Sequence, residues 1–333
     1  MTAMLLKATR LITDQHGLIT RRQALGAGYD DRDIRRMVKS GTWLLLRRGV
    51  YVDQELWESL DPYRGRPLLR VRAARLILRC EHVVSHDSAS LAHGIGAPDP
   101  IRALVHVTRR KVHGDAVRAG VKHHLAPYGE AQVCSVEGLP VLDLARTALD
   151  LAREHGLVAG VAACDQALRR GVTHQDLLNA RGAMWCWPHS RVMDEAIELA
   201  DPGSESWLES EGRVFVTQLG LGRPQTQFGL TDGLRTAYAD LRIGRHLFEI
   251  DGLGKFDEDL SGKPPMKVLA DEKSRQDFLT GFKLGVTRLT AYDLRAGRRA
   301  AEARSLREYL DTCARFGTDI SDLTPYLARP RRL

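Results

Sequence analysis

The clearest alternation of polar and apolar residues lies between residues 236 and 252, where Thr-Ala-Tyr-Ala-Asp-Leu-Arg-Ile is followed by Gly-Arg and then by His-Leu-Phe-Glu-Ile-Asp-Gly. Two strands joined by Gly244-Arg245 are predicted, because a two-residue type II′ loop takes glycine at its first central position. This register pairs Asp240 with Glu249, with Cβ atoms about 4.5–5.5 Å apart. Opposed carboxylates destabilise a sheet unless something compensates them, and a divalent cation is a natural compensation.

The apolar residues of the two strands share one face by period-two alternation: Ala237, Ala239, Leu241, Ile243, Phe248 and Ile250. We therefore expect that face to be buried and the acids, including Asp251, to lie on the other face. Two alternatives remain. The carboxylates are solvated or paired with Arg242 and Lys255, or a slip of one residue moves every side chain to the opposite face.

Further elements are predicted on both sides of this hairpin. The stretch from Ser206 to Leu219 is amphipathic and indicates a helix that carries Glu209, one turn after Glu205. Residues 268–284 indicate a second helix closed by Gly285 in the C′ position, and residues 286–290 a strand. The predicted order is helix, two strands, helix, strand.

The N-terminal segment has the signals of a helix-turn-helix. Thr20 and Gln23 have capping-box spacing, and Asp30 is a good N-cap for a helix that ends before Gly41. The glycine-containing turn between the two helices is tight. Residues 43–52 then predict a small hairpin with a charged tip, a wing, and residues 1–15 an apolar supporting helix.

Positive charge is concentrated in this segment. Residues 1–52 hold ten Lys and Arg against four acids, a net +6 of the +7 of the whole chain. The helix after Asp30 presents a broad basic face, as expected for a recognition helix in a major groove; the alternative is a basic helix that is merely solvated. The predicted DNA-binding residues are Arg21, Arg22, Arg32, Arg35, Arg36, Lys39, Arg47 and Arg48.

The middle of the chain predicts an α/β unit, with a strand at 104–108 and helices at 141–154 and 159–168. Its histidines show no ligand-and-spacing signature, so no metal site is predicted there. The length of 333 residues favours two or three domains, and turn-rich stretches at 53–67 and 200–203 suggest boundaries that give domains 1–55, 56–200 and 201–333.

Five cysteines without CxxC spacing favour a reducing compartment, and no apolar run is long enough to cross a bilayer. We therefore expect a cytoplasmic protein that does not associate with membranes.

The capped helix, the arginine-rich helix, and Ser40-Gly-Thr-Trp43 leading to Arg48-Gly-Val-Tyr51 resemble the N-terminal winged helix of the AbiEi antitoxin family. Segments 84–94, 104–108, 138–143 and 145–151 look like that family's second domain, so the resemblance covers about residues 1–200. It implies a DNA-binding antitoxin of a type IV toxin-antitoxin system that represses its own operon. The implied partners are double-stranded operator DNA and a cognate toxin that need not be held directly; a homodimer is also expected.

Residues 201–294 resemble the PD-(D/E)xK nuclease superfamily, and most closely its branch similar to very-short-patch-repair endonucleases. The resemblance implies that Asp240 and Glu249 hold Mg²⁺ or Mn²⁺ and that Glu209 is the acid of the preceding helix. Asp251 occupies the position of the family's lysine, and Lys255 is the nearest ammonium group. These five residues are the predicted catalytic set, but the departure at Asp251 also suits a nuclease-like domain that binds DNA without cutting it.

The expected fold is therefore a multidomain α+β and α/β protein, with a winged helix, a central α/β domain, and a nuclease-like domain that ends in a C-terminal helix. The expected function is an antitoxin-like transcriptional regulator; the alternative is a Mg²⁺-dependent DNA endonuclease of defence or repair, directed by the winged helix. A third interpretation is an acidic surface that binds a basic toxin without metal.

Overall fold

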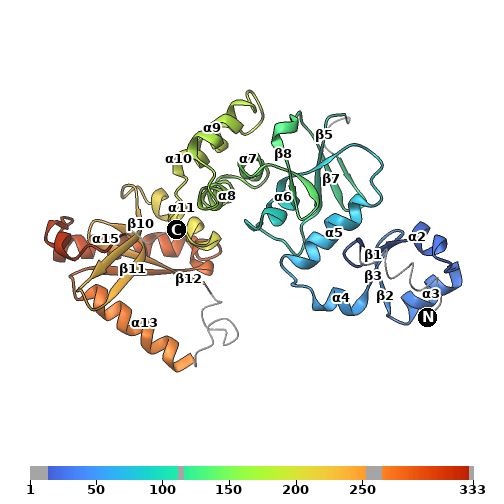
Figure 1. Ribbon diagram of the computed structural model, residues 1–333. Coiled ribbons are helices and arrows are strands. Elements are labelled where there is room, and N and C mark those ends of the chain that lie inside the picture. The colour runs from blue at the N-terminus through green and yellow to red at the C-terminus, as the bar shows by residue number, and fades with distance from the viewer. Residues whose placement is uncertain (1–13, 112–115, 253–264, 330–333) are drawn as a thin grey trace. The chain divides into compact units, whose positions relative to one another are not determined.

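The computed structural model describes residues 14–111, 116–252 and 265–329, with side chains from residue 273 onward in the last range. The chain divides into two compact units, Met1–Glu154 and His155–Leu333 (Figure 1). Both contain helices and sheets, so the predicted mixed α/β architecture is confirmed at this level. The boundary predicted near residue 200 lies inside the second unit.

The first unit begins with a small module of three strands and two helices. Its elements are β1 (Leu18–Thr20), α2 (Arg21–Gly26), α3 (Asp31–Lys39), β2 (Trp43–Arg47) and β3 (Val50–Asp53), and its antiparallel sheet has the order β1-β3-β2. The predicted capping box of Thr20 and Gln23 and the Asp30 cap are both present. The helices close over a core that includes Ile19, Ala24, Ile34 and Trp43. The predicted helix at 1–15 lies outside the described residues, except at its end.

A mixed six-stranded sheet follows in the same unit, with the order β6-β7-β5-β4-β9-β8. Its elements are α4 (Gln54–Ser59), α5 (Gly65–Arg75), β4 (Val83–Val84), α6 (His86–His93), β5 (Val105–Arg109), β6 (Ala116–Arg118), β7 (Val121–Leu125), η1 (Glu130–Gln132), β8 (Val133–Val136), β9 (Leu139–Leu142) and α7 (Leu144–His155). The helix predicted from residue 141 begins only at Leu144, because Val141 and Leu142 belong to β9 and pair with β8.

The second unit starts with four helices: α8 (Leu157–Arg169), α9 (His174–Gly182), α10 (Ser190–Leu199) and α11 (Trp207–Gln218). Helix α8 packs against both α10 and α11. Between α8 and α11, the buried Asp165 accepts hydrogen bonds at 2.7 and 2.5 Å from Nη2 of the buried Arg213. This ion pair joins the predicted end of the middle domain to the predicted start of the next one.

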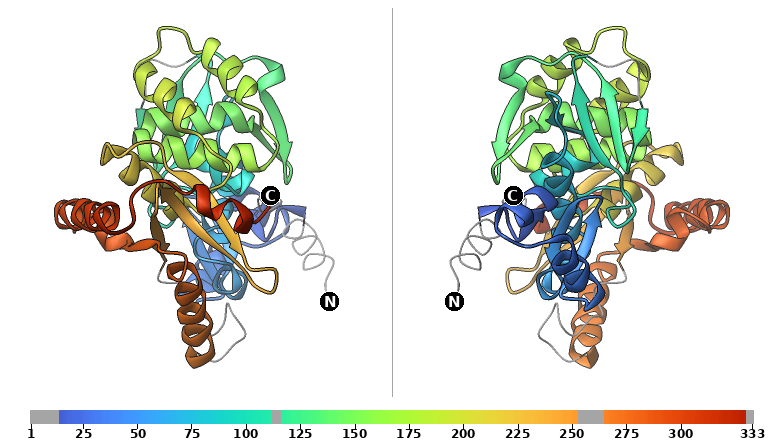
Figure 2. Two further views of the ribbon diagram at one scale, coloured as in Figure 1. Left: turned by 90° about the vertical axis from the view of Figure 1, so that its left-hand side faces the viewer. Right: turned by 90° about the vertical axis from the view of Figure 1, so that its right-hand side faces the viewer.

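The remaining elements form a four-stranded sheet covered by helices on both faces (Figures 1 and 2). They are β10 (Gln225–Thr231), β11 (Thr236–Ile243), β12 (His246–Asp251), α13 (Pro265–Thr280), β13 (Gly285–Thr290), α14 (Ala291–Leu294), α15 (Arg298–Phe316) and η3 (Ser321–Tyr326). The strand order is β10-β11-β12-β13, antiparallel except for the parallel pair β12-β13.

The predicted hairpin register is confirmed for the three strand pairs next to the loop, and the ladder ends before Asp240 and Glu249. Ile243 pairs with His246 and Leu241 with Phe248, and Gly244 has a φ of +56° at the first loop position. The role predicted for Gly285 is wrong. Helix α13 ends at Thr280, and Gly285 is the first residue of β13, where an added Cβ would lie 1.9 Å from Thr312 Oγ1. Close packing against α15 therefore explains this glycine better than a helix cap does.

The prediction of a single buried face on the hairpin is also wrong, because helices cover both faces. Leu241, Ile243, Phe248 and Ile250 pack with α11 and α15, whereas Ala237 and Ala239 pack with Leu247 and α13. The side chains of β11 thus change face at Asp240. Opposite Asp240, the β10 residue Gln227 has a φ of +48°, and the two residues are not paired in an otherwise continuous ladder. This backbone irregularity accounts for the change of face.

Candidate functional sites

The basic helix α3 is built as its sequence predicts. The Asp30 carboxylate accepts from the backbone N–H groups of Arg32 and Asp33 at 2.7 Å each, and Asp33 accepts in return from Asp30 N at 3.0 Å. These bonds satisfy donors that a helix N-terminus leaves free, and they lower the pKa of Asp30. Ile34 is the buried residue of the helix, so its basic side chains remain at the surface.

The eight predicted DNA-binding residues differ in what already holds them. Arg21 forms two hydrogen bonds to Asp31, Arg36 an ion pair with Asp33 at 3.3 Å, and Arg47 a hydrogen bond to Ala119 O at 2.8 Å. Five others are exposed and make no ion pair with any carboxylate of the described residues: Arg22, Arg32, Arg35, Lys39 and Arg48. These five cations are the ones most available to phosphate groups.

Two of them line a groove of about 480 Å³ together with a third exposed arginine, Arg79. Arg22 is on α2, Arg48 is at the tip of the β2-β3 hairpin, and Arg79 follows α5. The first turn of α2 is tied to the hairpin tip by a hydrogen bond from Arg21 N to Gly49 O at 2.9 Å. We call this feature the arginine groove; its full lining is Thr20, Arg22, Gln23, Arg48, Gly49, Leu76, Ile77 and Arg79.

Sequence reasoning missed Arg79 because it lies outside the predicted domain 1–55. Helix α5 carries Leu69 and Ala73, which share a core cluster with Leu18, Val50 and Val52 of the N-terminal sheet. This packing places the end of α5 beside the hairpin tip. No local signal in the sequence indicates it, because only the tertiary contact between the two segments defines the groove.

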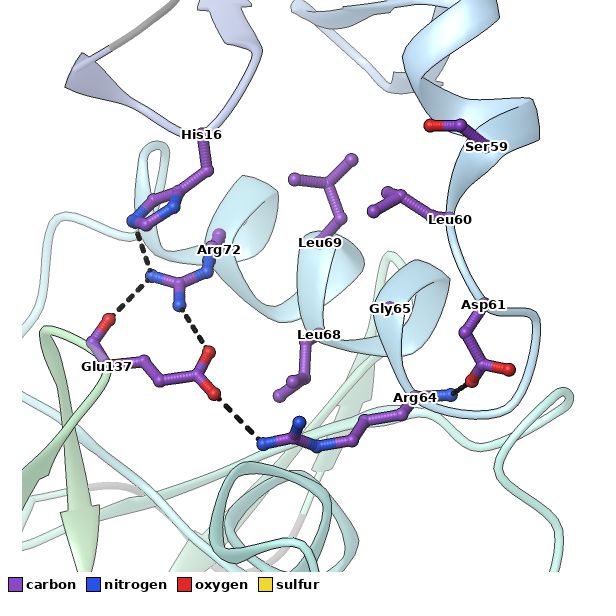
Figure 3. A pocket seen from close by; sticks show the side chains of 10 residues that line it. All are labelled: His16, Ser59, Leu60, Asp61, Arg64, Gly65, Leu68, Leu69, Arg72 and Glu137. Carbon is purple, nitrogen blue, oxygen red and sulfur yellow. Dashed lines mark hydrogen bonds and ion pairs between the residues drawn. The ribbon is translucent and has the colours of Figure 1, made fainter.

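A second cavity of the same unit, of about 420 Å³, contains an arginine-carboxylate network (Figure 3). Arg64 Nη2 donates to Glu137 Oε1 at 2.9 Å, and Arg72 Nη2 to Glu137 Oε2 at 3.2 Å. Arg72 also donates to Glu137 O and lies 2.9 Å from His16 Nε2. This network joins the N-terminal module to the six-stranded sheet. Because Glu137 already compensates both guanidinium groups, the cavity is less suited to binding an anion than the arginine groove is.

The described residues of the predicted acidic site come from three elements of the second unit, α11, β11 and β12. Glu209 lies in the first turn of α11, where it accepts from Ser206 Oγ at 2.9 Å and from Glu205 N at 2.7 Å. Burial raises the pKa of Glu209, and the nearby charge of Asp240 raises it further. The structure therefore brings Glu209 and Asp240 into the same neighbourhood.

Asp240 and Glu249 point to different partners, and the β11-β12 ladder ends at Leu241 and Phe248, so the two acids are not a strand pair. The Asp240 Oδ2 atom accepts from Ile250 N at 2.7 Å. Glu249 is buried, and its two oxygens accept from Arg275 of α13 at 2.6 and 3.3 Å. Asp251 forms an ion pair with Arg288 at 3.6 Å. Arg275 and Arg288 therefore compensate charge that the sequence analysis assigned to a metal ion.

These residues do not fit a magnesium site formed by Asp240 and Glu249 as they stand, because Glu249 is engaged by Arg275 through both oxygens. Magnesium needs hard oxygen ligands that are free to complete an octahedral shell. Within the described residues, the acids do not gather three ligand atoms in one place. Lys255 lies outside the described residues.

Comparison with known families gives a match over the N-terminal module. Residues 7–52 match the family model of the AbiEi antitoxin, a transcriptional regulator. The matched residues contain α2, α3 and the β2-β3 hairpin up to Val52, with all eight predicted DNA-binding residues. We call them the AbiEi-like segment.

The AbiEi-like segment supports the antitoxin resemblance at the N-terminus, while the match does not reach residues 201–333. No curated protein matches the chain. A search of the helices in the described residues found none with both the length and the apolar character needed to span a bilayer.

Proposed function

We propose that this protein is a DNA-binding transcriptional regulator of the antitoxin type, which binds a double-stranded operator through a winged helix formed by the AbiEi-like segment. The observation that carries the proposal is the set of five exposed cations without acid partners on α2, α3 and the hairpin tip, in a segment that matches a family of antitoxin regulators.

The contacts are assigned to the residues by position. Arg32, Arg35 and Lys39 are spaced by three and four residues and share one face of α3, which suits entry into a major groove. Arg48, at the hairpin tip, would reach the neighbouring backbone or minor groove. Arg22, in the first turn of α2 and in the same groove as Arg48, is assigned to a phosphate. Phosphate contacts supply affinity and register, while base contacts from α3 supply specificity.

The test uses the full-length protein and a duplex that covers the DNA upstream of its own gene, with a shuffled duplex of equal length as competitor. We expect tight binding to the upstream duplex and repression of a reporter placed behind it. Replacing Arg35 by alanine should reduce discrimination between the two duplexes, by about 1–3 kcal/mol if Arg35 contacts a base. Equal binding of both duplexes by the unchanged protein would contradict the proposed regulatory role.

The antitoxin proposal also implies that a toxin is encoded in the same operon. If the protein acts as a homodimer, the proposal further implies a palindromic operator. Dimeric helix-turn-helix proteins contact half-sites about 34–36 Å apart, one helical turn of DNA. Light scattering of the free protein and a footprint on the upstream duplex would measure both properties. A monomer that protects a single half-site would exclude the dimer.

A second candidate function is Mg²⁺- or Mn²⁺-dependent DNA cleavage, supported by the proximity of Glu209 and Asp240. It requires Glu249 to exchange Arg275 for a different partner. Incubation of supercoiled DNA with either metal, beside Asp240→Ala and an EDTA control, tests it directly. Metal-dependent nicking that the substitution abolishes would establish an enzyme. Retained DNA binding without nicking would favour a regulator with a silent nuclease-like domain.

A further inference from the structure

Three histidines from separate elements meet inside the first unit. His86 begins α6, His106 is on β5 and His124 is on β7, and each is no more than 5% exposed. One nitrogen from each lies within 4.8 Å of the others, and no other group of three potential metal ligands was found in the described part of the chain. Sequence spacing gave no sign of this cluster, because the parallel pairing of β5 and β7 creates it.

The chemistry of the cluster suits a transition-metal ion. Neutral imidazole is a ligand for zinc and related divalent ions, and three histidines form a known protein ligand set. Burial lowers the pKa of His86 well below its usual value and lowers that of His106 to about 4. Burial thus favours the neutral form of both rings, which is the form that binds a metal ion.

Two distances can be compared with those of such a site. His124 Nε2 and His106 Nδ1 share a hydrogen bond of 3.1 Å that an ion would replace, and this distance is close to the roughly 3.3 Å that separates two nitrogens on a tetrahedral zinc ion with bonds of about 2.0–2.1 Å. The other nitrogen of His106, Nε2, lies 3.7 Å from Asp87 Oδ2. This distance is longer than a hydrogen bond, so Asp87 acts on the ring through its charge, whereas the carboxylate behind a metal-binding histidine accepts a hydrogen bond from the ring.

His86 completes the group. Its Nε2 lies 3.8 Å from Asp150 Oδ1, and its Nδ1 lies 3.0 Å from Ser85 Oγ. Its backbone has a φ of +48°, an uncommon conformation for a side chain of this size, and such strain concentrates at functional sites. The ring stacks on His124 with centroids 3.6 Å apart. Because ring lone pairs lie in the ring plane, one of the two rings must tilt for both to reach one ion.

We propose that His86, His106 and His124 bind one divalent transition-metal ion of the zinc class and that the ion fastens α6 to strands β5 and β7. Charged side chains surround the three rings. Asp87 lies near His106 and Asp150 near His86, while Arg146 and Arg153 contact Asp150. The site is separate from the arginine groove and from the acidic residues of the second unit, so it does not depend on the proposed function.

The experiment uses the untagged full-length protein, stripped with a chelator and titrated with Zn²⁺ against a chromophoric competitor. We expect one tightly bound equivalent. Saturation should raise the unfolding temperature of the first unit by about 5–10 °C when free zinc is about 100 times Kd. Substitution by Co²⁺ should give the visible absorption of a four-coordinate ion with nitrogen ligands.

The variants His106→Asn and His124→Asn keep a polar side chain but remove the imidazole, and His174→Ala removes an exposed histidine at the start of α9. Zinc should be lost in both asparagine variants and retained in His174→Ala, with circular dichroism showing that all three fold. If either asparagine variant fails to fold, the cobalt spectrum of the unchanged protein decides. Absence of tight zinc and of that spectrum, or full binding by the asparagine variants, would overturn the proposal and leave a hydrogen-bonded histidine cluster.

Discussion

The arginine groove allows a quantitative test of the DNA-binding surface. Arg22, Arg48 and Arg79 are exposed, come from three elements, and form no ion pair with a carboxylate of the described residues. If each neutralises one phosphate, its replacement by alanine removes about 0.9 from the slope of log K against log salt. The triple variant should then lose about 2.7 in slope.

The expected size of the effect follows from that slope. Raising the salt from about 50 to 200 mM is a fourfold change. Over this change, each phosphate contact lowers the binding constant by a further factor of about 3.5. Over this range, the affinity of the triple variant should fall about 40-fold less than that of the unchanged protein. Fluorescence anisotropy with a labelled duplex of unrelated sequence measures this effect, because phosphate contacts do not depend on sequence.

Arg21 and Arg36 provide the matched control. They belong to the same AbiEi-like segment and carry the same charge, but Asp31 and Asp33 already hold them. The double variant Arg21→Ala, Arg36→Ala should change the slope less than replacement of Arg22 and Arg48. Equal changes in slope would show that local ion pairs do not decide which arginines meet DNA. An unchanged slope in Arg79→Ala alone would remove the groove from the interface.

Three further predictions concern the second unit, and urea or thermal unfolding followed by tryptophan fluorescence measures each. Asp165→Ala leaves the charge of the buried Arg213 uncompensated and should lower the free energy of unfolding by about 3–5 kcal/mol. Asp194→Ala breaks a more exposed pair with Arg181 and should lower it by at most about 1 kcal/mol. Equal losses would show that burial does not set the cost. Gly285→Ala places a Cβ 1.9 Å from Thr312 Oγ1 and should destabilise the unit by about 1–3 kcal/mol. The Cβ of Gly182→Ala meets no atom within 4 Å, so this variant should be neutral or stabilising. A neutral Gly285→Ala would refute the claim that close packing against α15 requires glycine at this position. Burial lowers the pKa of His246 to about 4, so between pH 6.5 and 4 the unfolded chain binds a proton that the folded unit does not. The free energy of unfolding should therefore fall as the pH drops from 6.5 towards 4. His246→Gln should flatten that dependence, and an equally steep profile would show that His246 is not its cause.

Local signals in the sequence predicted local structure well. The capping boxes of α2 and α3 and the Gly244-Arg245 loop each depend on residues within a few positions of one another, and all are present. The type II′ loop fixes the strand register because glycine accepts the positive φ that the loop requires. The three strand pairs next to the loop were therefore predictable to the residue.

Side-chain partners from distant elements were not predictable in the same way. Arg275 reaches Glu249 across 26 positions, and His86 and His124 are 38 positions apart before the sheet brings them together. The second face of the hairpin was missed for the same reason. Alternation shows which residues share a face of a strand, but it does not show that a further helix, here α13, covers the opposite face.

The acidic residues show why a register that is correct beside the loop did not predict the chemistry of the acids beyond it. Alternation on β11 and β12 predicts opposed carboxylates, and the expected remedy is a cation. The structure supplies cations from its own side chains, since Arg275 holds Glu249 and Arg288 holds Asp251, while a backbone N–H holds Asp240. Glu209 and Asp240 remain close enough for the charge of one to raise the pKa of the other. A magnesium ion would have to compete with Arg275, which already donates to both oxygens of Glu249, and this competition weighs against a metal site formed by Asp240 and Glu249.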